Sequence, residues 1–467
     1  MKKALHTGFK AYQQPFKYLQ NRRLLYFVSN QELLNSQPEN LEKMLPKDKS
    51  IYIGFDPTAE SIHLGNYVGL LTLTHFRLAG YNPIIVFGGA TALIGDPSGK
   101  VNDRQQLLKE QVENNLKKFE LQFSYLTKNI DRYLQSKQNE IEDLRDIGVI
   151  KPYKFVNNYD FYRDLNLITF LRDIGVHFRL NNMIAKDSVK SRIDAKDGGD
   201  GMSFTEFTYQ IFQGYDFFRL RKDHNCQMQI GGSDQWGNIS SGCELIRRVL
   251  NEEAYGATIQ LLVNSQGQKF GKSEGNTGGI WCDPKKTEPY DLYQFLLNIS
   301  DQDVENLLYK LTFLPLQLID ETMIVHNQDQ EKRVAQKLLA STLCEIIHGQ
   351  EGVDQAIGAT GAFFRFKIEE IMQMSKDQFQ ENFKHTKKIQ ILLNEGQEID
   401  MISIGHQAGV KQTKADIRRL IDQKGLVVNG KQIESNKQIK KQDLLHQKYL
   451  ILRSGKKNFA LVEVDYQ

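Results

Sequence analysis

Residues 51–66 read IYIGFDPTAESIHLGN, and this stretch decides the fold of the chain. Its first five residues have the apolar pattern of a strand, and after a polar turn apolar residues recur at helical spacing from Leu64 to Ala79. Gly80 follows where a left-handed helix C-cap is expected, and residues 84–87 have a second apolar strand pattern. This order predicts a βαβ unit, whose parallel strands bind ligands at their carboxyl ends.

A second junction of the same kind lies downstream. Residues 227–230 have a strand pattern, Gly231 and Gly232 follow, and a helical pattern extends over residues 237–250. The intervening residues 101–150 are rich in Lys and Gln, which predicts helices with a solvated outer face. The two junctions together predict an α/β domain with a Rossmann-like parallel sheet.

The composition changes along the chain and predicts five segments. After Trp281, strand patterns become sparse and helical patterns dominate. The last 67 residues hold thirteen Lys or Arg against six Asp or Glu, a net charge of +7, whereas the other 400 residues have a net charge of −4. We expect an N-terminal extension, an α/β domain, a helical domain, a linker and a small basic module at residues 1–48, 49–287, 288–385, 386–400 and 401–467.

The polar turn at residues 56–62 leads straight into a helix, and this arrangement suits a phosphate group. The first amides of a helix have no intrahelical partner and lie at the positive end of its dipole. Thr58 and His63 can donate hydrogen bonds to phosphate oxygens as charge develops, and Gly65 lets a flat base approach the backbone. A histidine at a helix start can also be a simple cap. These residues alone fit both interpretations.

A glycine-rich segment far downstream contains the sequence KFGKS at residues 269–273. Its two lysines, Lys269 and Lys272, flank a glycine. This pattern predicts a mobile loop that closes over a triphosphate and stabilises the departing pyrophosphate. Such a loop, taken alone, also fits a solvated turn.

Together the two segments resemble the signature motifs HIGH and KMSKS of class I aminoacyl-tRNA synthetases. Here they read HLGN and KFGKS, in the same order and on a βαβ frame. Asn66 replaces the last His of the first motif, and the second motif lacks the usual methionine. The resemblance narrows to the tyrosyl-tRNA synthetases of bacteria and organelles through residues 51–100, 157–160, 203–216 and 231–238. It covers nearly the whole chain beyond the first fifty residues. The resemblance implies that residues 49–287 form the catalytic domain, that the helical domain 288–385 binds the anticodon, and that 401–467 form a small α+β RNA-binding module.

The resemblance implies a reaction and a set of site residues. The enzyme would activate L-tyrosine with ATP to tyrosyl-adenylate and pyrophosphate, and then transfer tyrosine to the 3′ end of tRNA(Tyr). Catalytic roles would fall on Thr58, His63, Asn66, Lys269, Lys272 and Ser273. Tyrosine would contact Tyr52, Asp96, Tyr209, Gln213, Asp216 and Gln235. ATP would contact Gly54, Asp56, Gly65, Gly232, Asp234, Lys100 and Arg104. Lys100 and Arg104 also fit a pair of surface cations without a role in the site.

Tyr52 and Asp216 have a physical rationale as well. A hydroxyl and a carboxylate can hold the phenol hydroxyl of tyrosine, and such a site rejects phenylalanine because its own buried polar groups are then left unpaired; tyrosine selection by this family is a known example. The tryptophanyl enzyme, which shares the architecture, is the close rival. An RNA-binding protein that kept the synthetase fold for splicing or ribosome attachment is the rival from another class.

Residues 401–467 resemble the small RNA-binding module of a ribosomal small-subunit protein and of bacterial tyrosine enzymes. The resemblance rests on a basic helix at 415–421, a strand and turn at 425–430 and residues 454–459. The basic residues expected to meet RNA phosphates are Lys414, Arg418, Arg419, Lys456 and Lys457. A lysine-rich solvated surface is the alternative that charge alone leaves open.

Cofactors, partners and location complete the expectations. ATP is expected with Mg²⁺, without a prosthetic group or a protein-bound metal, and the resemblance implies a homodimer. No window is apolar over the length of a membrane span. Residues 1–31 are basic, with no acidic residue before Glu32, which suits a mitochondrial matrix presequence; a plain basic extension of a cytoplasmic enzyme is the alternative. The Gly- and Asp-rich stretch 194–201 has no assigned role.

Overall fold

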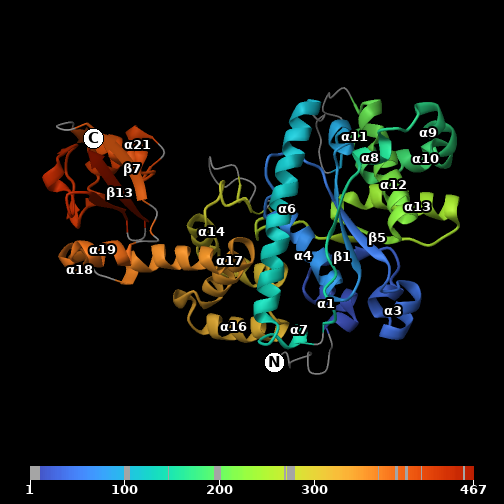
Figure 1. Cartoon of the computed structure of the whole chain (residues 1–467), viewed down its shortest axis with the longest axis horizontal. Coiled ribbons are helices and arrows are strands. Elements are labelled where there is room, and N and C mark those ends of the chain that lie inside the picture. The colour runs from blue at the N-terminus through green and yellow to red at the C-terminus, as the bar shows by residue number, and fades with distance from the viewer. Residues whose placement is uncertain are drawn as a thin grey trace. The chain divides into compact units, whose positions relative to one another are not determined.

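The computed structural model of the protein divides into two compact units (Figure 1). Unit 1 comprises Met1–Glu288 and Gln294–Gly349, and unit 2 comprises Pro289–Tyr293 and Gln350–Gln467. The structure describes residues 11–98, 106–145, 147–193, 201–267, 270, 279–365, 368–383, 386, 388–394, 398–411, 413–455 and 458–466. No helix among these residues is long and apolar enough to cross a membrane.

A six-stranded sheet with the order β1-β6-β5-β2-β3-β4 forms the centre of unit 1. Its strands are β1 (Leu25–Val28), β2 (Ser50–Phe55), β3 (Asn82–Phe87), β4 (Lys154–Asn157), β5 (Cys226–Gly232) and β6 (Tyr255–Ile259). All neighbours run parallel except β1, which runs antiparallel to β6. The chain winds from β2 to β3 and β4 on one side and continues with β5 and β6 on the other. The β2–β5 boundary is therefore the switch point at which such sheets bind ligands, and the predicted Rossmann-like fold is confirmed.

Helices cover both faces of this sheet. They are η1 (Ala11–Gln13), α1 (Pro15–Asn21), α2 (Glu32–Asn35), α3 (Pro38–Met44), α4 (Leu64–Leu78), α5 (Thr91–Ile94), α6 (Lys109–Lys137), α7 (Glu142–Arg145), α8 (Tyr159–Tyr162), α9 (Leu167–Asp173), η2 (Gly175–His177), α10 (Leu180–Ile184), α11 (Asp187–Ile193), α12 (Phe204–His224), η3 (Ser233–Gln235) and α13 (Trp236–Leu250). Ile53 of β2 points to α4, because a Cβ on Gly69 of α4 would lie 2.5 Å from its Cδ1. The preceding side chain, Tyr52, points to the opposite face, where its ring centroid lies 5.2 Å from that of Phe217 in α12. α4 and α12 thus enclose β2 from opposite faces.

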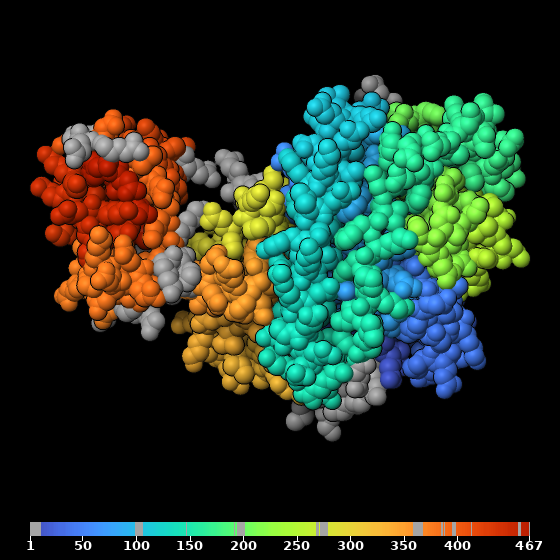
Figure 2. All heavy atoms as spheres, in the orientation of Figure 1, coloured from blue at the N-terminus to red at the C-terminus, as the bar shows by residue number. Residues whose placement is uncertain are grey.

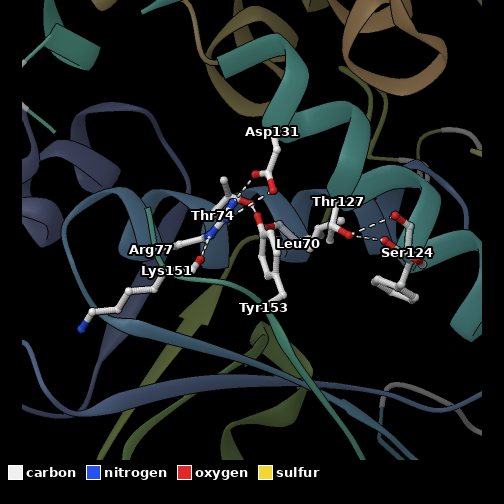
Figure 3. Close-up of polar contacts among 9 residues, drawn as sticks. Leu70, Thr74, Arg77, Ser124, Thr127, Asp131, Lys151 and Tyr153 are labelled. Atoms are coloured by element: carbon white, nitrogen blue, oxygen red, sulfur yellow. Dashed lines mark hydrogen bonds and ion pairs between the residues drawn. The ribbon is translucent and has the colours of Figure 1, made fainter. Parts of the chain in front are cut away.

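Buried polar contacts join α4 to α6, which runs along the surface of unit 1 in cyan (Figure 2). Arg77 of α4 is 4% exposed, and its guanidinium donates to both carboxylate oxygens of Asp131 in α6 and to the backbone carbonyl oxygen of Lys151 (Figure 3). The same guanidinium lies 4.1 Å from the ring centroid of Tyr153, whose hydroxyl bonds to Thr74 Oγ1 at 2.6 Å. One arginine thereby holds two segments against α4.

The N-terminal segment is an integral part of unit 1. β1 completes the sheet, and Arg22, just after α1, is fully buried. Its guanidinium donates to three backbone carbonyl oxygens near the end of α15 (Asp301–Leu311), those of Tyr309 at 3.2 Å, Leu314 at 2.8 Å and Thr312. The expectation that the catalytic domain begins at residue 49 therefore differs from the structure, because residues before it supply a strand and a buried cation.

The helical region after the sheet does not form one unit. Its elements are α14 (Pro289–Leu297), α15, α16 (Leu316–Gln328), η4 (Gln330–Lys332) and α17 (Val334–Arg365). Tyr67 of α4 donates its hydroxyl to the carbonyl oxygen of Leu311, so α15 packs on α4 of unit 1. Gly349 interrupts α17 with φ 77° and ψ 174°, and the boundary between the units falls there. The expected helical domain 288–385 is therefore divided between both units.

Unit 2 is an α+β body around a five-stranded sheet of order β10-β9-β12-β13-β7. Its elements are α18 (Ile368–Gln373), α19 (Lys376–Asn382), β7 (Lys388–Leu393), β8 (Ile399–Asp400), α20 (Met401–Gln407), α21 (Lys414–Asp422), β9 (Leu426–Val428), β10 (Lys431–Gln432), β11 (Gln438–Ile439), η5 (Lys441–Asp443), β12 (Tyr449–Ser454) and β13 (Asn458–Tyr466). The expected linker 386–400 contains β7, which pairs in parallel with β13 and buries Ile391 and Leu393. Phe379 and Phe383 pack with Tyr449, so α19 also belongs to this body.

Candidate active site

A cavity of about 340 Å³ opens at the carboxyl ends of β2 and β5, at the switch point of the sheet. Fourteen of the residues predicted to catalyse or to bind tyrosine or ATP are described, and all of them line it: Tyr52, Gly54, Asp56, Thr58, His63, Gly65, Asn66, Asp96, Tyr209, Gln213, Asp216, Gly232, Asp234 and Gln235. The predicted residues Lys100, Arg104, Lys269, Lys272 and Ser273 lie outside the described residues. Phe270, between the two lysines, also lines the cavity.

A buried carboxylate, Asp216 of α12, marks one end of the cavity. It is 4% exposed and accepts hydrogen bonds from the amide of Asn158 at 2.8 Å and from the hydroxyl of Tyr162 at 2.6 Å. Burial raises the pKa of Asp216 to about 7, although both hydrogen bonds favour the charged form. Tyr52, 2% exposed, has no hydrogen-bond partner for its hydroxyl within the described part of the chain. An unpaired buried hydroxyl is costly, which favours a polar ligand atom there.

Asn158 fixes one oxygen of this carboxylate. Its Oδ1 accepts a hydrogen bond from the backbone amide of Ala90 at 2.8 Å, so its Nδ2 must face the other way. From there it donates to Asp216 at 2.8 Å and to Thr91 Oγ1 at 3.0 Å. The Asn158 amide is therefore held in one orientation from two sides.

A second carboxylate, Asp56, lies just after β2. Its Oδ2 accepts the hydroxyl of Tyr209 at 2.7 Å, and its Oδ1 accepts the hydroxyl of Thr91 at 2.6 Å. Burial, with Asp56 adding to it, raises the pKa of Tyr209 well above its usual value. A Cβ on Gly88 would lie 1.8 Å from Asp56 Oδ1, so that position has room only for glycine. The family resemblance implies that the backbone amide of Asp56 serves the α-phosphate of ATP, and its side chain here accepts hydrogen bonds from two hydroxyls.

Asp96 follows α5 and is held by three donors. Gln235 donates to its Oδ2 at 2.7 Å, and the backbone amide of Ser98 and the side chain of Asn238 donate to its Oδ1 at 3.0 and 3.4 Å. Asn238 also donates to Gln235 Oε1 at 3.2 Å, which turns the Gln235 amide nitrogen toward Asp96. Burial raises the pKa of Asp96. The cavity thus contains a negatively polarised corner suited to an ammonium group.

His63 and Asn66 form a reciprocal cap at the start of α4. His63 Nδ1 accepts the backbone amide of Asn66 at 3.3 Å, and Asn66 Oδ1 accepts the backbone amide of His63 at 3.1 Å. A Cβ on Gly65 would lie 2.8 Å from the imidazole Cε1, so glycine is needed beneath the ring. Both sequence interpretations of His63 therefore fit, because it caps the helix and also lines the cavity.

Two glycines at the end of β5 leave room for the carboxylate of Asp234. A Cβ on Gly232 would lie 2.6 Å from Asp234 Oδ1, and a Cβ on Gly231 would lie 2.9 Å from Gln235 Cβ. Asp234 therefore folds against a bare backbone, which suits a diol such as a ribose approaching from the cavity.

Comparison with known proteins agrees with this geometry. Residues 46–365 match the family model of class I tRNA synthetases for tryptophan and tyrosine, and residues 378–462 match the SYY-like C-terminal domain of tyrosine-tRNA ligases. The chain is 40% identical over 418 residues to the mitochondrial tyrosine-tRNA ligase of Drosophila melanogaster, covering 89% of this chain and 87% of that protein. It is 40% identical over 428 residues to tyrosine-tRNA ligase 1 of Bacillus subtilis, covering 91% and 94%. The chain belongs to the tyrosine-tRNA ligase family.

A solved relative agrees. The C-terminally truncated mitochondrial tyrosyl-tRNA synthetase of Aspergillus nidulans superposes with a TM-score of 0.62 at 31% identity, covering 73% of this chain and 91% of that one. This tyrosine-tRNA ligase is a class I aminoacyl-tRNA synthetase, an enzyme that uses ATP as substrate. The tryptophanyl and non-enzymatic alternatives are not favoured.

Three of the five predicted RNA-binding residues lie on an exposed helix, α21. Lys414, Arg418 and Arg419 of α21 are all exposed, while Ile417 of the same helix is buried in the core of unit 2. Arg419 forms a loose ion pair of 3.6 Å with Asp416 and keeps most of its surface free for solvent. Lys456 and Lys457 lie outside the described residues.

Three residues that were not predicted from the sequence line the cavity or contact its lining residues. Asn158 and Thr91 line it, and Tyr162 touches Asp216 from outside. Asn158 lies in the block 157–160 that resembles the family, but nothing in the local sequence links it to a carboxylate 58 residues away. Only the packing of α8 on α12 brings them together.

Proposed function

We propose that this tyrosine-tRNA ligase activates L-tyrosine and ATP in the cavity between β2 and β5 and then transfers tyrosine to the 3′ end of tRNA(Tyr). The observation that carries the site assignment is the buried pair at its closed end. Tyr52 offers an unsatisfied hydroxyl, and Asp216 retains acceptor positions beyond those used by its two donors. A phenol hydroxyl inserted there donates to Asp216 and accepts from Tyr52, which phenylalanine cannot do.

The amino-acid backbone of tyrosine then reaches the opposite corner. Asp96, Tyr209 and Gln213 receive its ammonium group, because two half-buried carboxylates, those of Asp96 and Asp56, make this corner attractive to a cation. Gln235 has one amide hydrogen engaged with Asp96, and its second can approach the carboxylate of tyrosine. The reacting carboxylate thus points toward the start of α4.

ATP occupies the part of the cavity lined by the helix cap and the glycines. Asp234 receives the ribose hydroxyls against Gly232, and Gly65 and Gly54 leave room for the base and sugar. The backbone amide of Asp56 points to the α-phosphate, and three polar groups stabilise charge during in-line attack by the tyrosine carboxylate on the α-phosphorus: Thr58, His63 and Asn66.

Cationic and polar groups for the departing pyrophosphate come from two segments, residues 100–104 and the KFGKS motif at 269–273. We assign them to Lys100, Arg104, Lys269, Lys272 and Ser273. Mg²⁺ would enter bound to the ATP phosphates, since the described residues contain no group of three or more His, Cys, Asp or Glu placed to hold a metal. Bound there, it would neutralise phosphate charge.

Exchange of labelled pyrophosphate into ATP tests this assignment. We expect exchange with tyrosine, and far less with tryptophan or phenylalanine, and we expect Asp216→Ala to abolish it. Absence of exchange with every amino acid would contradict the proposed chemistry. Exchange with tryptophan would contradict the assigned phenol pocket.

An exposed apolar surface supports assembly as a homodimer. Side chains of α9, η2 and α10 leave a cluster in solvent: Leu167, Ile168, Leu171, Val176 and Leu180. Such clusters on soluble enzymes usually mark a protein–protein interface. The family resemblance implies that the partner at this interface is a second copy of this chain. Sedimentation should show a dimer that Ile168→Asp converts to monomer. Ile324→Asp, at a similarly exposed isoleucine of α16, should leave the dimer intact.

We further propose that the enzyme serves the mitochondrial matrix, with cytoplasmic residence as the alternative. Named relatives include both mitochondrial and bacterial enzymes. The basic composition at residues 1–31 supports import, but Arg22 and Arg23 have structural partners, so the targeting signal rests on the lysines before them. Import of the labelled chain into isolated mitochondria should occur, and should fail after replacement of Lys2, Lys3 and Lys10 by Glu.

A further inference from the structure

The hydroxyl of Tyr162, at the end of α8, has two acceptors and one proton. It lies 2.6 Å from Asp216 Oδ1 and 2.8 Å from the carbonyl oxygen of Phe212. Its ring is packed against those of Phe212 and Tyr215, at centroid distances of 5.2 and 5.5 Å. A hydroxyl donates only one hydrogen bond at a time, so Tyr162 must choose between the carboxylate and the carbonyl.

The choice depends on whether Asp216 carries a proton. When Asp216 is ionised, Tyr162 donates to Oδ1 and Asn158 donates to Oδ2. When Asp216 is protonated, its proton cannot point at the Asn158 amide, whose orientation is fixed by Ala90. The proton then lies on Oδ1 and is donated to Tyr162, which turns its own proton to Phe212. The pair therefore has two complete hydrogen-bond arrangements.

The groups around Asp216 and Tyr162 allow both hydrogen-bond arrangements to be populated near neutral pH. Titratable groups facing Asp216 are the phenols of Tyr52, Tyr162 and Tyr209 and the carboxylate of Asp56, while Tyr215 faces Tyr162. Burial is the main cause that brings the pKa of Asp216 to about 7, and the bonds from Tyr162 and Asn158 oppose this rise. The ionised arrangement accepts the phenol hydroxyl of a substrate more strongly, because a hydrogen bond to a carboxylate is charge-assisted, whereas the neutral carboxyl offers only its carbonyl oxygen.

We propose that Tyr162 is a positioning residue for tyrosine selection: its hydroxyl holds Asp216 ionised and oriented so that the carboxylate accepts the phenol hydroxyl of the substrate. This proposal rests on the assignment of Asp216 to the phenol of tyrosine. Tyr162 contacts the carboxylate of Asp216 but does not itself line the cavity.

Tyr162→Phe tests the proposal, because it keeps the ring and removes the hydroxyl alone. Loss of a hydrogen bond to a charged group should lower kcat/KM for tyrosine about tenfold at pH 7. The pH profile of kcat/KM between pH 6 and 8.5 should rise later than in the unmodified enzyme, because the carboxylate loses a donor that favours its charged form. KM for ATP should not change, and preference for tyrosine over phenylalanine should fall most below pH 7.

Tyr159→Phe is the matched control. Tyr159 lies on the same helix, its ring faces Lys109, and its hydroxyl does not touch Asp216, so this variant should keep the original pH profile. Tyrosine-induced protection against thermal unfolding, measured over the same pH range, reports binding even if chemistry is lost. An unshifted profile in Tyr162→Phe, for exchange or for protection, would overturn the proposal. Absence of tyrosine-dependent exchange and protection in the unmodified enzyme would instead overturn the proposed function.

Discussion

Asp216 has a second consequence, which concerns stability. Its pKa is raised to about 7 in the folded protein, so between the ordinary carboxyl pKa and pH 7 the folded state binds a proton that the unfolded state releases. This group therefore stabilises the fold at low pH, and the contribution is lost as pH rises toward 7, on the order of 4 kcal/mol in total. Asp216→Asn should raise the thermal midpoint of unit 1 relative to the unmodified protein at pH 7.5, and less so at pH 5. The exposed Asp160→Asn should show no such trend.

Single residues were predictable from the sequence where a short local motif carried them. His63, Asn66 and Asp234 lie in such motifs, and all three line the cavity. Tyr162 escaped prediction because its partner lies 54 residues away, and a tyrosine beside a charged stretch has no distinguishing pattern. Contacts of this kind exist only after two helices have packed.

At the level of elements, α4 and α6 are joined by an ion pair whose two partners are buried unequally. The side chain of Arg77 is 3% exposed and that of Asp131 is 35% exposed. Asp131→Asn should therefore cost more than Arg77→Met, about 3 kcal/mol against about 1 kcal/mol, because the first leaves a buried cation unpaired while the second leaves a carboxylate that water can reach. Urea unfolding of both variants measures the difference. Equal costs would show that packing, and not charge, dominates the contact.

Elements with a full periodic pattern were predictable, and short ones that depend on distant partners were not. The βαβ unit from β2 to β3 follows from apolar spacing alone, and Gly80 takes the expected left-handed conformation with φ 97°. β7 was assigned to a linker because the polar residues 382–388 just before it lack strong periodicity, and its pairing partner β13 lies at the other end of the module. β1 was missed for the same reason, since β6 is far away in the sequence.

For the molecule as a whole, the proposed function assigns different parts of one reaction to the two compact units. In this proposal, pyrophosphate exchange needs only the cavity of unit 1, whereas transfer also needs tRNA. Replacing Lys414, Arg418 and Arg419 by Glu should weaken tRNA binding by at least about tenfold at physiological salt and flatten its dependence on salt, because contacts to phosphate are lost. Exchange should remain unchanged. A fall in exchange would show that the α21 surface also supports the first step.

The fully buried Arg22 has a consequence for maturation of the polypeptide. Its three carbonyl partners near the end of α15 are left without their donor if the segment before β1 is removed. Tyr12 and Phe16, whose rings pack on His75 and Phe76, would be lost with it. If the amino terminus is trimmed on import, as the proposed matrix location implies, we therefore expect the cut to fall upstream of Ala11, since removal of the residues through Arg22 should destabilise unit 1 rather than yield a shorter active form.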